Sequence, residues 1–402
     1  MLSFYHPFFI IYGLLLLVLI YIVFKFTAQR GLDTSLEESK IKYKVAHWVQ
    51  EIARSIISFK LSGKTSHALE KNDTLVDDYL DARESHFRVL VLQFIQMIGF
   101  KVLVTAGLLL IGGLLVLEQQ MNIGQFVAAE IIILLVISSV EKLILGLETF
   151  YDLLTSLEKM GQVVDKELEP QDGETPFKEN EGLTVELEDI VYKVPGLDKK
   201  IIDHLSLTIK PDTKLLIQGK SGSGRSTLLR MIAGILEPDE GKIYVNNVAL
   251  KGIKLSQYRS YLGHSLTEEY PFEGTLLDNI TFGNKDISME DVYWALEKVS
   301  LSEFVKEQPQ GLKTILYPEG KKFPDFISRK IVLARSIVTR PKLMVLKDPL
   351  EQYDEEGTEK MMDFLTDPAN GWALVVVSEN PKWAKRCNQV IRMEKGRLIN
   401  VN

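Results

Sequence analysis

The chain has 402 residues, and its 47 Lys and Arg against 54 Asp and Glu give a formal net charge of −7. This length allows more than one domain, and the acidic balance argues against a nucleic-acid partner. The single cysteine, Cys387, excludes an intrachain disulfide framework and a multi-cysteine metal site, and it fits a reducing cytoplasm. The hydrophobic share of 46% averages two unlike parts, because long apolar runs precede residue 165 and a soluble α/β pattern follows it.

The first apolar run predicts a membrane span over residues 4–26. Its core, FFIIYGLLLLVLIYIVF, has no charge and is long enough to cross a bilayer. A signal peptide is the alternative, but the run has neither a basic n-region before it nor an A-x-A-like cleavage site after it. Lys25 and Arg30 follow the run and no Lys or Arg precedes it. The positive-inside rule therefore places the N-terminus outside the cell and the residues after the span in the cytoplasm.

Two further spans are expected after a polar segment. Residues 31–88 have hydrophobic positions at helical spacing and are too polar for lipid, which predicts a cytoplasmic helical extension. Gly63–Thr74 interrupts this segment, so we expect two helices joined by a turn. The second span is expected over residues 89–117 and the third over residues 124–147, with an external turn at Glu118–Gln125.

Four charged residues fall within these last two spans. Lys101 is embedded in the second span, and Glu141 and Lys142 are expected near the cytoplasmic end of the third. Glu130 lies near the outer end, where it either snorkels to the surface or faces a translocation path.

The second part of the chain predicts a cassette of alternating strands and helices. Residues 1–165 form the predicted membrane domain, residues 166–182 are acidic with Pro and Gly and read as a linker, and residues 183–402 form the second domain. Strand patterns cover Leu183–Tyr192, Ile201–Ile209, Gly241–Leu250, Lys342–Leu346 and Ala373–Val377, with a turn at Asn246 and Asn247. Helical patterns cover Met289–Leu301 and Ile327–Val338. A terminal turn is expected at Lys395–Leu398.

A glycine-rich segment between an apolar strand and an amphipathic helix predicts a phosphate-binding loop. It fits G-x-x-x-x-G-K-[ST] except that Arg225 replaces the lysine. Glycines let successive backbone N–H groups point inward, and the helix adds its positive N-terminal end. We expect Ser226 to offer its hydroxyl to Mg²⁺ and Arg225 to contact the phosphates of ATP. The predicted nucleotide-binding residues are Gly219, Lys220, Ser221, Gly222, Ser223, Gly224, Arg225, Ser226 and Thr227.

The order of these motifs resembles an exporter-type ABC transporter. Residues 183–402 resemble its nucleotide-binding cassette, with the phosphate loop, a helical insertion, the LARSIV helix, a strand ending at Asp348-Pro349, and then VVVSEN and RMEKGRLI. Residues 1–165 resemble the last three of the six spans of its membrane domain, including the MNIGQF turn between the final two. The resemblance implies a membrane α-helical domain fused to an α/β P-loop NTPase cassette with a helical insertion.

The positions that carry hydrolysis in this family are substituted. At the Walker B strand, where Asp-Glu is expected, the chain has Lys347 and Asp348, and Asp348 is only a weak candidate for the general base. The signature segment falls on Phe323–Ile327, and its Pro324 offers neither a hydroxyl nor an N–H. Asp325 suits the N-cap of the helix that follows. The glutamine that contacts the site falls at Thr267 and the switch histidine at Glu379, which cannot donate a hydrogen bond when ionised. The aromatic residue that stacks on adenine falls near Tyr192 or Val194, with Tyr192 as the candidate.

The resemblance also implies partners and a location. Cassettes of this family act as head-to-tail pairs, so a second half-transporter is expected, in a homodimer or a heterodimer, and a separate chain supplying further spans is possible. The expected location is the plasma (inner) membrane, in contact with membrane lipid, as a multi-pass protein with the cassette in the cytoplasm. Three interpretations stay open: a transport subunit with ATP and Mg²⁺ as cofactors and little hydrolysis, a non-catalytic regulatory or scaffold subunit, and an N-terminally truncated exporter half. No feature of the sequence identifies a substrate.

Overall fold

The computed structural model describes residues 8–63, 66–178, 181–320, 322–351 and 353–400. The chain divides into two compact units, Met1–Leu168 and Glu169–Asn402. Among the described residues, the first unit has helices and no strand, and the second unit is an α/β domain. This division agrees with the composition shift along the sequence.

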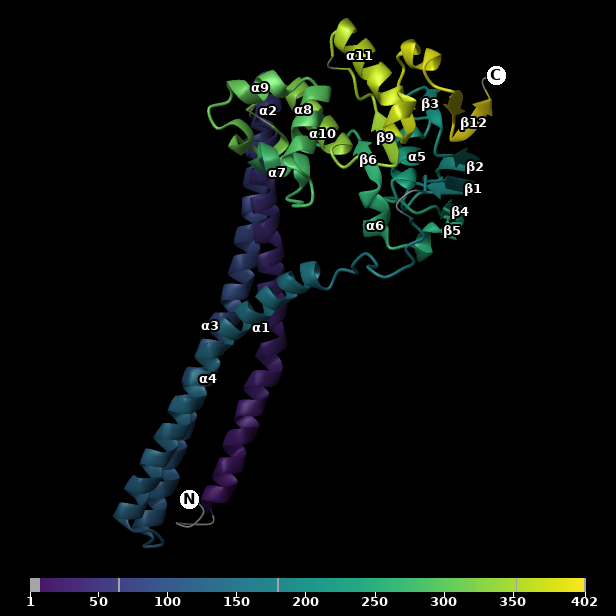
Figure 1. The fold of residues 1–402 in the computed structure, drawn as a ribbon. Helices are drawn as coiled ribbons and strands as arrows, with labels where there is room; N and C mark the ends of the chain where they lie inside the picture. Colours follow the sequence, from purple (N-terminus) through teal and green to yellow (C-terminus); the bar gives the residue numbers. More distant parts are fainter. Residues whose placement is uncertain (1–7, 64–65, 179–180, 321, 352, 401–402) are drawn as a thin grey trace. The chain divides into compact units, whose positions relative to one another are not determined.

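The first unit consists of long helices that pack side by side (Figure 1). They are α1 (Phe8–Arg54), the short α2 (Ile56–Ser62), α3 (Ser66–Leu117) and α4 (Ile123–Val164). The turn expected over Gly63–Thr74 is shorter than predicted, because α3 already begins at Ser66. Gly63 ends α2 in the left-handed conformation, with φ of +65°, which glycine adopts without strain. The expected external turn is also shorter, because the Asn122 and Gln125 side chains form a capping box that starts α4 at Ile123.

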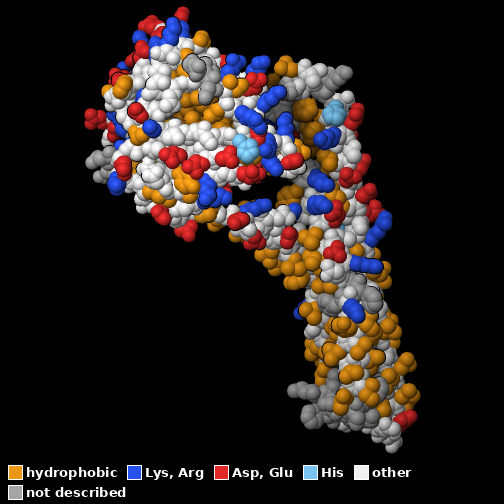
Figure 2. Space-filling model, turned by 90° about the vertical axis from the view of Figure 1, so that its right-hand side faces the viewer, with side chains coloured by type: hydrophobic (Ala, Val, Ile, Leu, Met, Phe, Trp, Pro, Cys, Tyr) orange, Lys and Arg blue, Asp and Glu red, His pale blue; other side chains and the backbone are white. Residues whose placement is uncertain are grey.

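The apolar segments of α3 and α4 are each long enough to cross a membrane. In α1, the described apolar stretch is the shorter Ile10–Ile22, and residues 4–7 of the expected first span lie outside the described residues. That span, and the orientation derived from it, therefore stay predictions. Figure 2 shows hydrophobic side chains covering one half of the helical unit, while charged side chains gather on the other half. An exposed apolar band of this kind suits contact with lipid or with further helices.

Buried residues of α1, α3 and α4 hold the helical unit together. The seam includes Val104 and Leu108 of α3 and Ala129 and Ile133 of α4, and the Tyr12 hydroxyl of α1 donates to the Val104 carbonyl. The embedded Lys101 lies 3.6 Å from the Glu141 carboxylate, an ion pair between α3 and α4. A pair of opposite charges lowers the cost of placing either in an apolar layer.

The second unit contains two larger sheets. The six-stranded sheet has the order β12-β11-β3-β10-β9-β6, in which all neighbours are parallel except β11 and β12. The four-stranded antiparallel sheet has the order β2-β1-β4-β5. A short pair, β7 (Gly274–Thr275) and β8 (Ile315–Leu316), lies apart from both. The strands of the larger sheets are β1 (Val185–Lys193), β2 (Lys200–Ile209), β3 (Lys214–Gly219), β4 (Glu240–Val245), β5 (Val248–Ala249), β6 (Leu262–Ser265), β9 (Leu343–Lys347), β10 (Ala373–Val377), β11 (Gln389–Glu394) and β12 (Arg397–Asn400).

The six-stranded sheet is buried on both faces. Consecutive residues of β3, such as Leu215 and Leu216, enter two different cores, because successive side chains on a strand point to opposite faces of the sheet. One core includes the antiparallel sheet and α5 (Arg225–Ile232). The other includes residues from α7 (Leu276–Thr281), α8 (Met289–Lys298), α9 (Ser302–Glu307), α10 (Asp325–Ile337) and α11 (Glu355–Thr366). The remaining α-helix among the described residues of this unit is α6 (Leu255–Ser260).

The segment predicted as a linker over residues 166–182 is packed on the second unit for part of its length. Glu174 pairs with Ile253 in an isolated bridge, and the Phe177 ring lies 5.0 Å from that of Tyr261. The Glu169 carboxylate binds Arg259 of α6 at 2.5 and 2.7 Å, which lowers the pKa of Glu169. The acidic, Pro-containing composition predicted a linker, and the structure adds that some of its apolar and charged residues contact the cassette. Residues 179–180 lie outside the described residues.

Candidate nucleotide-binding site

The predicted phosphate loop connects the end of β3 to the start of α5. Gly219, Gly222 and Gly224 have φ values of +150°, +81° and +101°, which L-residues with a Cβ rarely adopt. A Cβ on Gly219 would also lie 2.3 Å from the Met393 carbonyl oxygen. The first N–H groups of a helix have no partner inside it, and no side chain caps α5 at Gly224. The loop therefore has the backbone of an anion-binding turn.

A cleft of about 590 Å³ opens over this loop. Ser221 through Thr227 line it, so seven of the nine predicted loop residues face the same space, while Lys220 is exposed outside it. The cleft walls come from distant parts of the chain, and the basic residues among them are Lys199, Lys200, Arg225, Lys347 and Lys395. Within the described part of the chain, no acidic side chain lines this cleft. Its charge therefore favours an anion such as a phosphate chain.

Arg225, the predicted phosphate-binding cation, forms an ion pair in the structure. Its guanidinium donates to the carboxylate of Glu379, which follows β10. The Arg225 side chain is 14% exposed and that of Glu379 is 66% exposed. The residue at the expected histidine position is thus bound to the cation of the loop. An incoming phosphate has to compete with this carboxylate for Arg225.

Asp348, the weak candidate for general base, lies beside the loop in a strained position. Its backbone has φ of +42°, and its N–H donates to the Val377 carbonyl at 2.9 Å. Burial raises the pKa of Asp348, while the Ser378 hydroxyl and the charge of Lys347 act in the opposite direction. Asp348 lines a separate cleft of about 230 Å³ that shares Lys347 with the first one. The structure thus places Asp348 near the phosphate cleft and not among its lining residues.

The residues around Ser226 do not fit a Mg²⁺ ion. Magnesium prefers six oxygen ligands and is held in proteins by one or two carboxylates together with substrate phosphates. Ser226 lines the cleft, but the strand that should supply a carboxylate ends in Lys347. No group of three or more His, Cys, Asp or Glu suited to a metal occurs among the described residues. An ammonium group beside the hydroxyl repels a divalent cation.

Tyr192, the candidate for adenine stacking, is not among the residues that line the phosphate cleft. Tyr192 of β1 is half-buried against the core and pairs across the sheet with Ile202. The neighbouring Val194 lines the phosphate cleft instead. A stacking role for Tyr192 stays a prediction.

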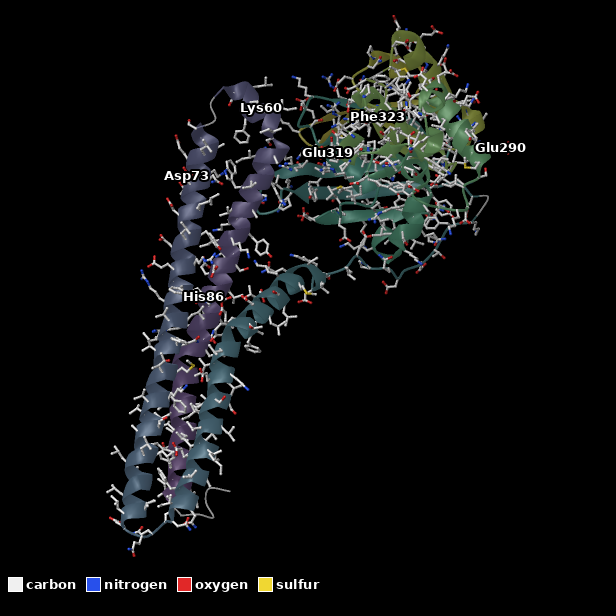
Figure 3. All side chains as sticks on the ribbon, turned by 90° about the vertical axis from the view of Figure 1, so that its left-hand side faces the viewer. Lys60, Asp73, His86, Glu290, Glu319 and Phe323 are labelled. Carbon is white, nitrogen blue, oxygen red and sulfur yellow. The ribbon has the colours of Figure 1, made fainter. Side chains whose placement is uncertain are left out.

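The segment at the family signature position keeps its helix. α10 begins at Asp325, and its N-cap position is occupied by Pro324, so the prediction of Asp325 as N-cap is off by one residue. Asp325 instead adds a negative charge to the first turn, where it complements the helix dipole. The Phe323 ring, labelled in Figure 3, packs edge-on against the Phe304 ring, and the ring centroids are 5.4 Å apart. Aromatic packing thus occupies a segment that the family uses for phosphate contact.

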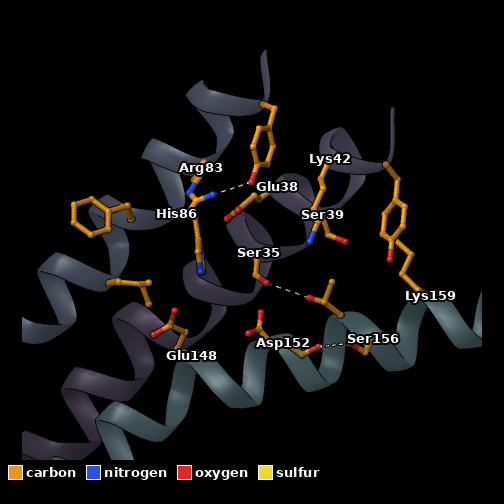
Figure 4. Close-up of a pocket in the computed structure, with 15 residues that line it drawn as sticks. Ser35, Glu38, Ser39, Lys42, Arg83, His86, Glu148, Asp152, Ser156 and Lys159 are labelled. Carbon is orange, nitrogen blue, oxygen red and sulfur yellow. Dashed lines mark hydrogen bonds between the residues drawn. The ribbon is translucent and has the colours of Figure 1, made fainter. Parts of the chain in front are cut away.

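The helical unit has a polar cavity of its own, of about 540 Å³ (Figure 4). Its lining residues come from α1, α3 and α4, and all of them except Leu90 lie outside the predicted spans. The Ser35 and Thr155 hydroxyls are 3.1 Å apart, and His86 Nδ1 lies 2.8 Å from the Thr34 hydroxyl. These contacts satisfy buried polar groups between the helices, as expected where a bundle continues beyond the membrane.

Sequence reasoning missed three basic residues of the phosphate cleft. Lys199 and Lys200 lie before and at the start of β2, and Lys395 lies in the β11–β12 turn with φ of +48°. The lysines of KK at 199–200 and of EKGR at 394–397 are the only signals in the sequence, and surface lysines are common.

Comparison with known proteins agrees with this geometry. Residues 202–351 match the ABC transporter family. The chain is 24% identical over 316 residues to the alpha-hemolysin translocation ATP-binding protein HlyB of Escherichia coli, covering 78% of this chain and 45% of that protein. It is 23% identical over 376 residues to the ATP-dependent lipid A-core flippase of Xanthomonas campestris pv. campestris, covering 92% of this chain and 62% of the flippase. The chain thus spans about half the length of the curated relatives it matches.

A solved structure extends the likeness to the fold of nearly the whole chain. A bacterial Atm1-family ABC exporter with ATP bound matches with a TM-score of 0.84 and 16% identity, covering 97% of this chain and 68% of the exporter. Residues 202–351 therefore carry an ABC transporter domain, and the chain as a whole is similar to exporter-type ABC proteins and shares the fold of one, with a helical unit followed by an ABC cassette.

Proposed function

We propose that the chain is a membrane subunit of an exporter that binds ATP through Gly219–Thr227, couples nucleotide state to export and hydrolyses ATP slowly or not at all. The observation that carries the proposal is the contrast within one site. The loop has an anion-binding backbone and a basic cleft, whereas Lys347 and Glu379 stand where the family places groups that support hydrolysis. Binding therefore has a physical basis and water activation does not.

The proposal includes an assembly and a location. A cassette of this type needs a second cassette to complete its nucleotide sites, so we expect a homodimer or a heterodimer with a related half-transporter. The apolar surfaces of α3 and α4 support a place in the plasma (inner) membrane, with the cassette in the cytoplasm. In a heterodimer, this chain contributes a poor signature segment to the site of its partner, because Pro324 and Asp325 offer no hydroxyl to a phosphate.

A non-catalytic regulatory or scaffold subunit is the second candidate. The Arg225–Glu379 ion pair favours it, because a loop whose cation is already bound to a carboxylate can remain empty. The two candidates differ in whether the cassette binds nucleotide at cellular concentrations.

The test uses the full-length chain in lipid nanodiscs. ATP binding is measured by calorimetry with Mg²⁺ and with EDTA, and hydrolysis is measured by phosphate release. We expect Arg225→Ala to weaken binding about tenfold, as loss of one charge-assisted contact implies. Arg230→Ala is the matched control, since Arg230 lies on the same helix and pairs with Glu268 outside the cleft.

Each outcome separates the candidates. Binding without turnover supports the proposal. Turnover at an ordinary enzymatic rate of about 1 s⁻¹ or more, abolished by Arg225→Ala, contradicts the loss of hydrolysis. Absence of ATP binding in both conditions contradicts the nucleotide role and favours the scaffold.

A further inference from the structure

Lys347 stands at the position in the chain where the family resemblance places the carboxylate that supports a Mg²⁺ ion. It is the last residue of β9, which packs against α5, the helix that carries Ser226. Both Lys347 and Ser226 line the same cleft. At the end of β9, the cleft therefore has an ammonium group where the family resemblance predicts a carboxylate that holds a metal ion.

The rest of the cleft can neutralise a phosphate chain without a metal. Lys199 and Lys395 line it together with Lys347. Two further cations in the lining already have partners: Lys200 lies 2.9 Å from the Asp203 carboxylate, and Arg225 is bound to Glu379. A triphosphate brings several negative charges, and three to four nearby cations are a sufficient match.

A separate observation shows that the loop has an unused polar group. The Ser223 side chain is only 5% exposed, and its Oγ has no hydrogen-bond partner among the described residues. Ser223 also lines the cleft. A buried hydroxyl without a partner costs free energy that a ligand oxygen can recover.

We propose that this cassette binds the phosphate chain of a nucleoside triphosphate without a metal ion, with the Lys347 ammonium in the place of Mg²⁺. The proposal rests on the nucleotide binding proposed above and adds its cation requirement. Metal-free binding also explains why the loss of the Walker B carboxylate at Lys347 goes together with the proposed loss of hydrolysis. A site that holds no Mg²⁺ needs no Walker B carboxylate, and its phosphates lack the metal that supports in-line attack by water.

The test compares ATP binding by the full-length chain in nanodiscs at equal ionic strength, with excess EDTA or with excess Mg²⁺. We expect the wild-type chain to bind ATP in EDTA at least as tightly as in Mg²⁺. Lys347→Met should weaken binding in EDTA about tenfold and gain nothing from Mg²⁺. Lys347→Asp restores the family residue and should make binding depend on Mg²⁺.

Lys360→Met is the control for loss of an exposed lysine, because Lys360 lies on α11 and pairs with Glu356. It should bind ATP as the wild-type chain does. A second readout uses Mn²⁺ with ATP and electron paramagnetic resonance. We expect the Lys347→Asp variant, and not the wild-type chain, to immobilise Mn²⁺–ATP.

The outcomes distinguish metal-free binding from the nucleotide binding that it presupposes. Wild-type binding that is lost in EDTA overturns metal-free binding and leaves nucleotide binding intact. Equal affinity of the wild-type chain and Lys347→Met for metal-free ATP overturns the role of Lys347. Absence of ATP binding in both EDTA and Mg²⁺ overturns the nucleotide proposal and this inference together.

Discussion

Replacing Glu379 with glutamine should strengthen ATP binding, because it frees Arg225. The carboxylate of Glu379 is bound to the Arg225 guanidinium, and Glu379 follows β10 beside the phosphate loop. Glutamine keeps the shape and removes the charge. A phosphate that takes over Arg225 then neither breaks an ion pair nor approaches a fixed negative charge.

The size of the effect follows from the exposure of the pair. Two unit charges 4 Å apart interact by about 1 kcal/mol in bulk water and about 4 kcal/mol at an effective dielectric constant of 20. The Glu379 side chain is 66% exposed, so the lower figure applies. About 1 kcal/mol corresponds to about a fivefold gain in affinity, since about 1.4 kcal/mol is tenfold.

The assay is equilibrium binding of a fluorescent ATP analogue to the full-length chain in nanodiscs. Glu268→Gln is the matched control, because it removes the carboxylate of a similar pair with Arg230 that does not line the cleft. At 1 M salt, where the screening length falls to about 3 Å, the gain from Glu379→Gln should shrink. Unchanged or weaker binding by Glu379→Gln at low salt would refute the competition between carboxylate and phosphate.

Three further predictions concern stability and reactivity. Gly219→Ala should lower the free energy of unfolding by about 1–3 kcal/mol. The reason is that residue 219 has a backbone φ of +150° and that a Cβ there would collide with the Met393 carbonyl oxygen. A melting temperature equal to that of the wild-type chain would contradict this strain. The hydrogen bonds from Arg259 lower the pKa of Glu169, so this contact should stabilise the packed linker above the ordinary glutamate pKa and be lost as the pH falls through the lowered value. Limited proteolysis of Glu169→Gln should therefore show faster linker cleavage than the wild-type chain at pH 7, with a difference that disappears in acid. Burial raises the pKa of the Cys387 thiol to about 12, so maleimide should label it slowly at pH 8 in the folded chain and quickly after unfolding, and fast labelling of the folded chain would contradict the burial.

Local features of the fold could be predicted from the sequence, because they depend on neighbouring residues. The phosphate loop is one example, since three glycines in a short span permit positive φ angles wherever the segment lies. The turn at Asn246 and Asn247, with φ of +47° and +65°, is another, because asparagine tolerates the left-handed region. The apolar residues of β9 before Lys347 and the wholly apolar β10 likewise had to be buried on both faces of the sheet.

The helix boundaries were less predictable, because capping depends on geometry over a few residues. Gly63–Thr74 looks like a long turn in composition, yet α3 begins at Ser66 and includes most of it. The contacts of the predicted linker were unpredictable for a similar reason, since the partners of Glu169 and Phe177 lie on α6 and the residue after it. Composition alone does not show where a polar segment finds its contacts.

The glycine-rich loop, the long apolar helices and the substitutions at the positions where the family resemblance places catalytic groups can all be read from the sequence alone. The contacts that these substituted residues make with one another depend on the fold. Arg225 and Glu379 are 154 residues apart in the sequence, and Lys347 lies on yet another strand. The sheet order β3-β10-β9 brings the carboxyl ends of these parallel strands to one edge, and this juxtaposition turns separate substitutions into a basic cleft with one cation bound to a carboxylate.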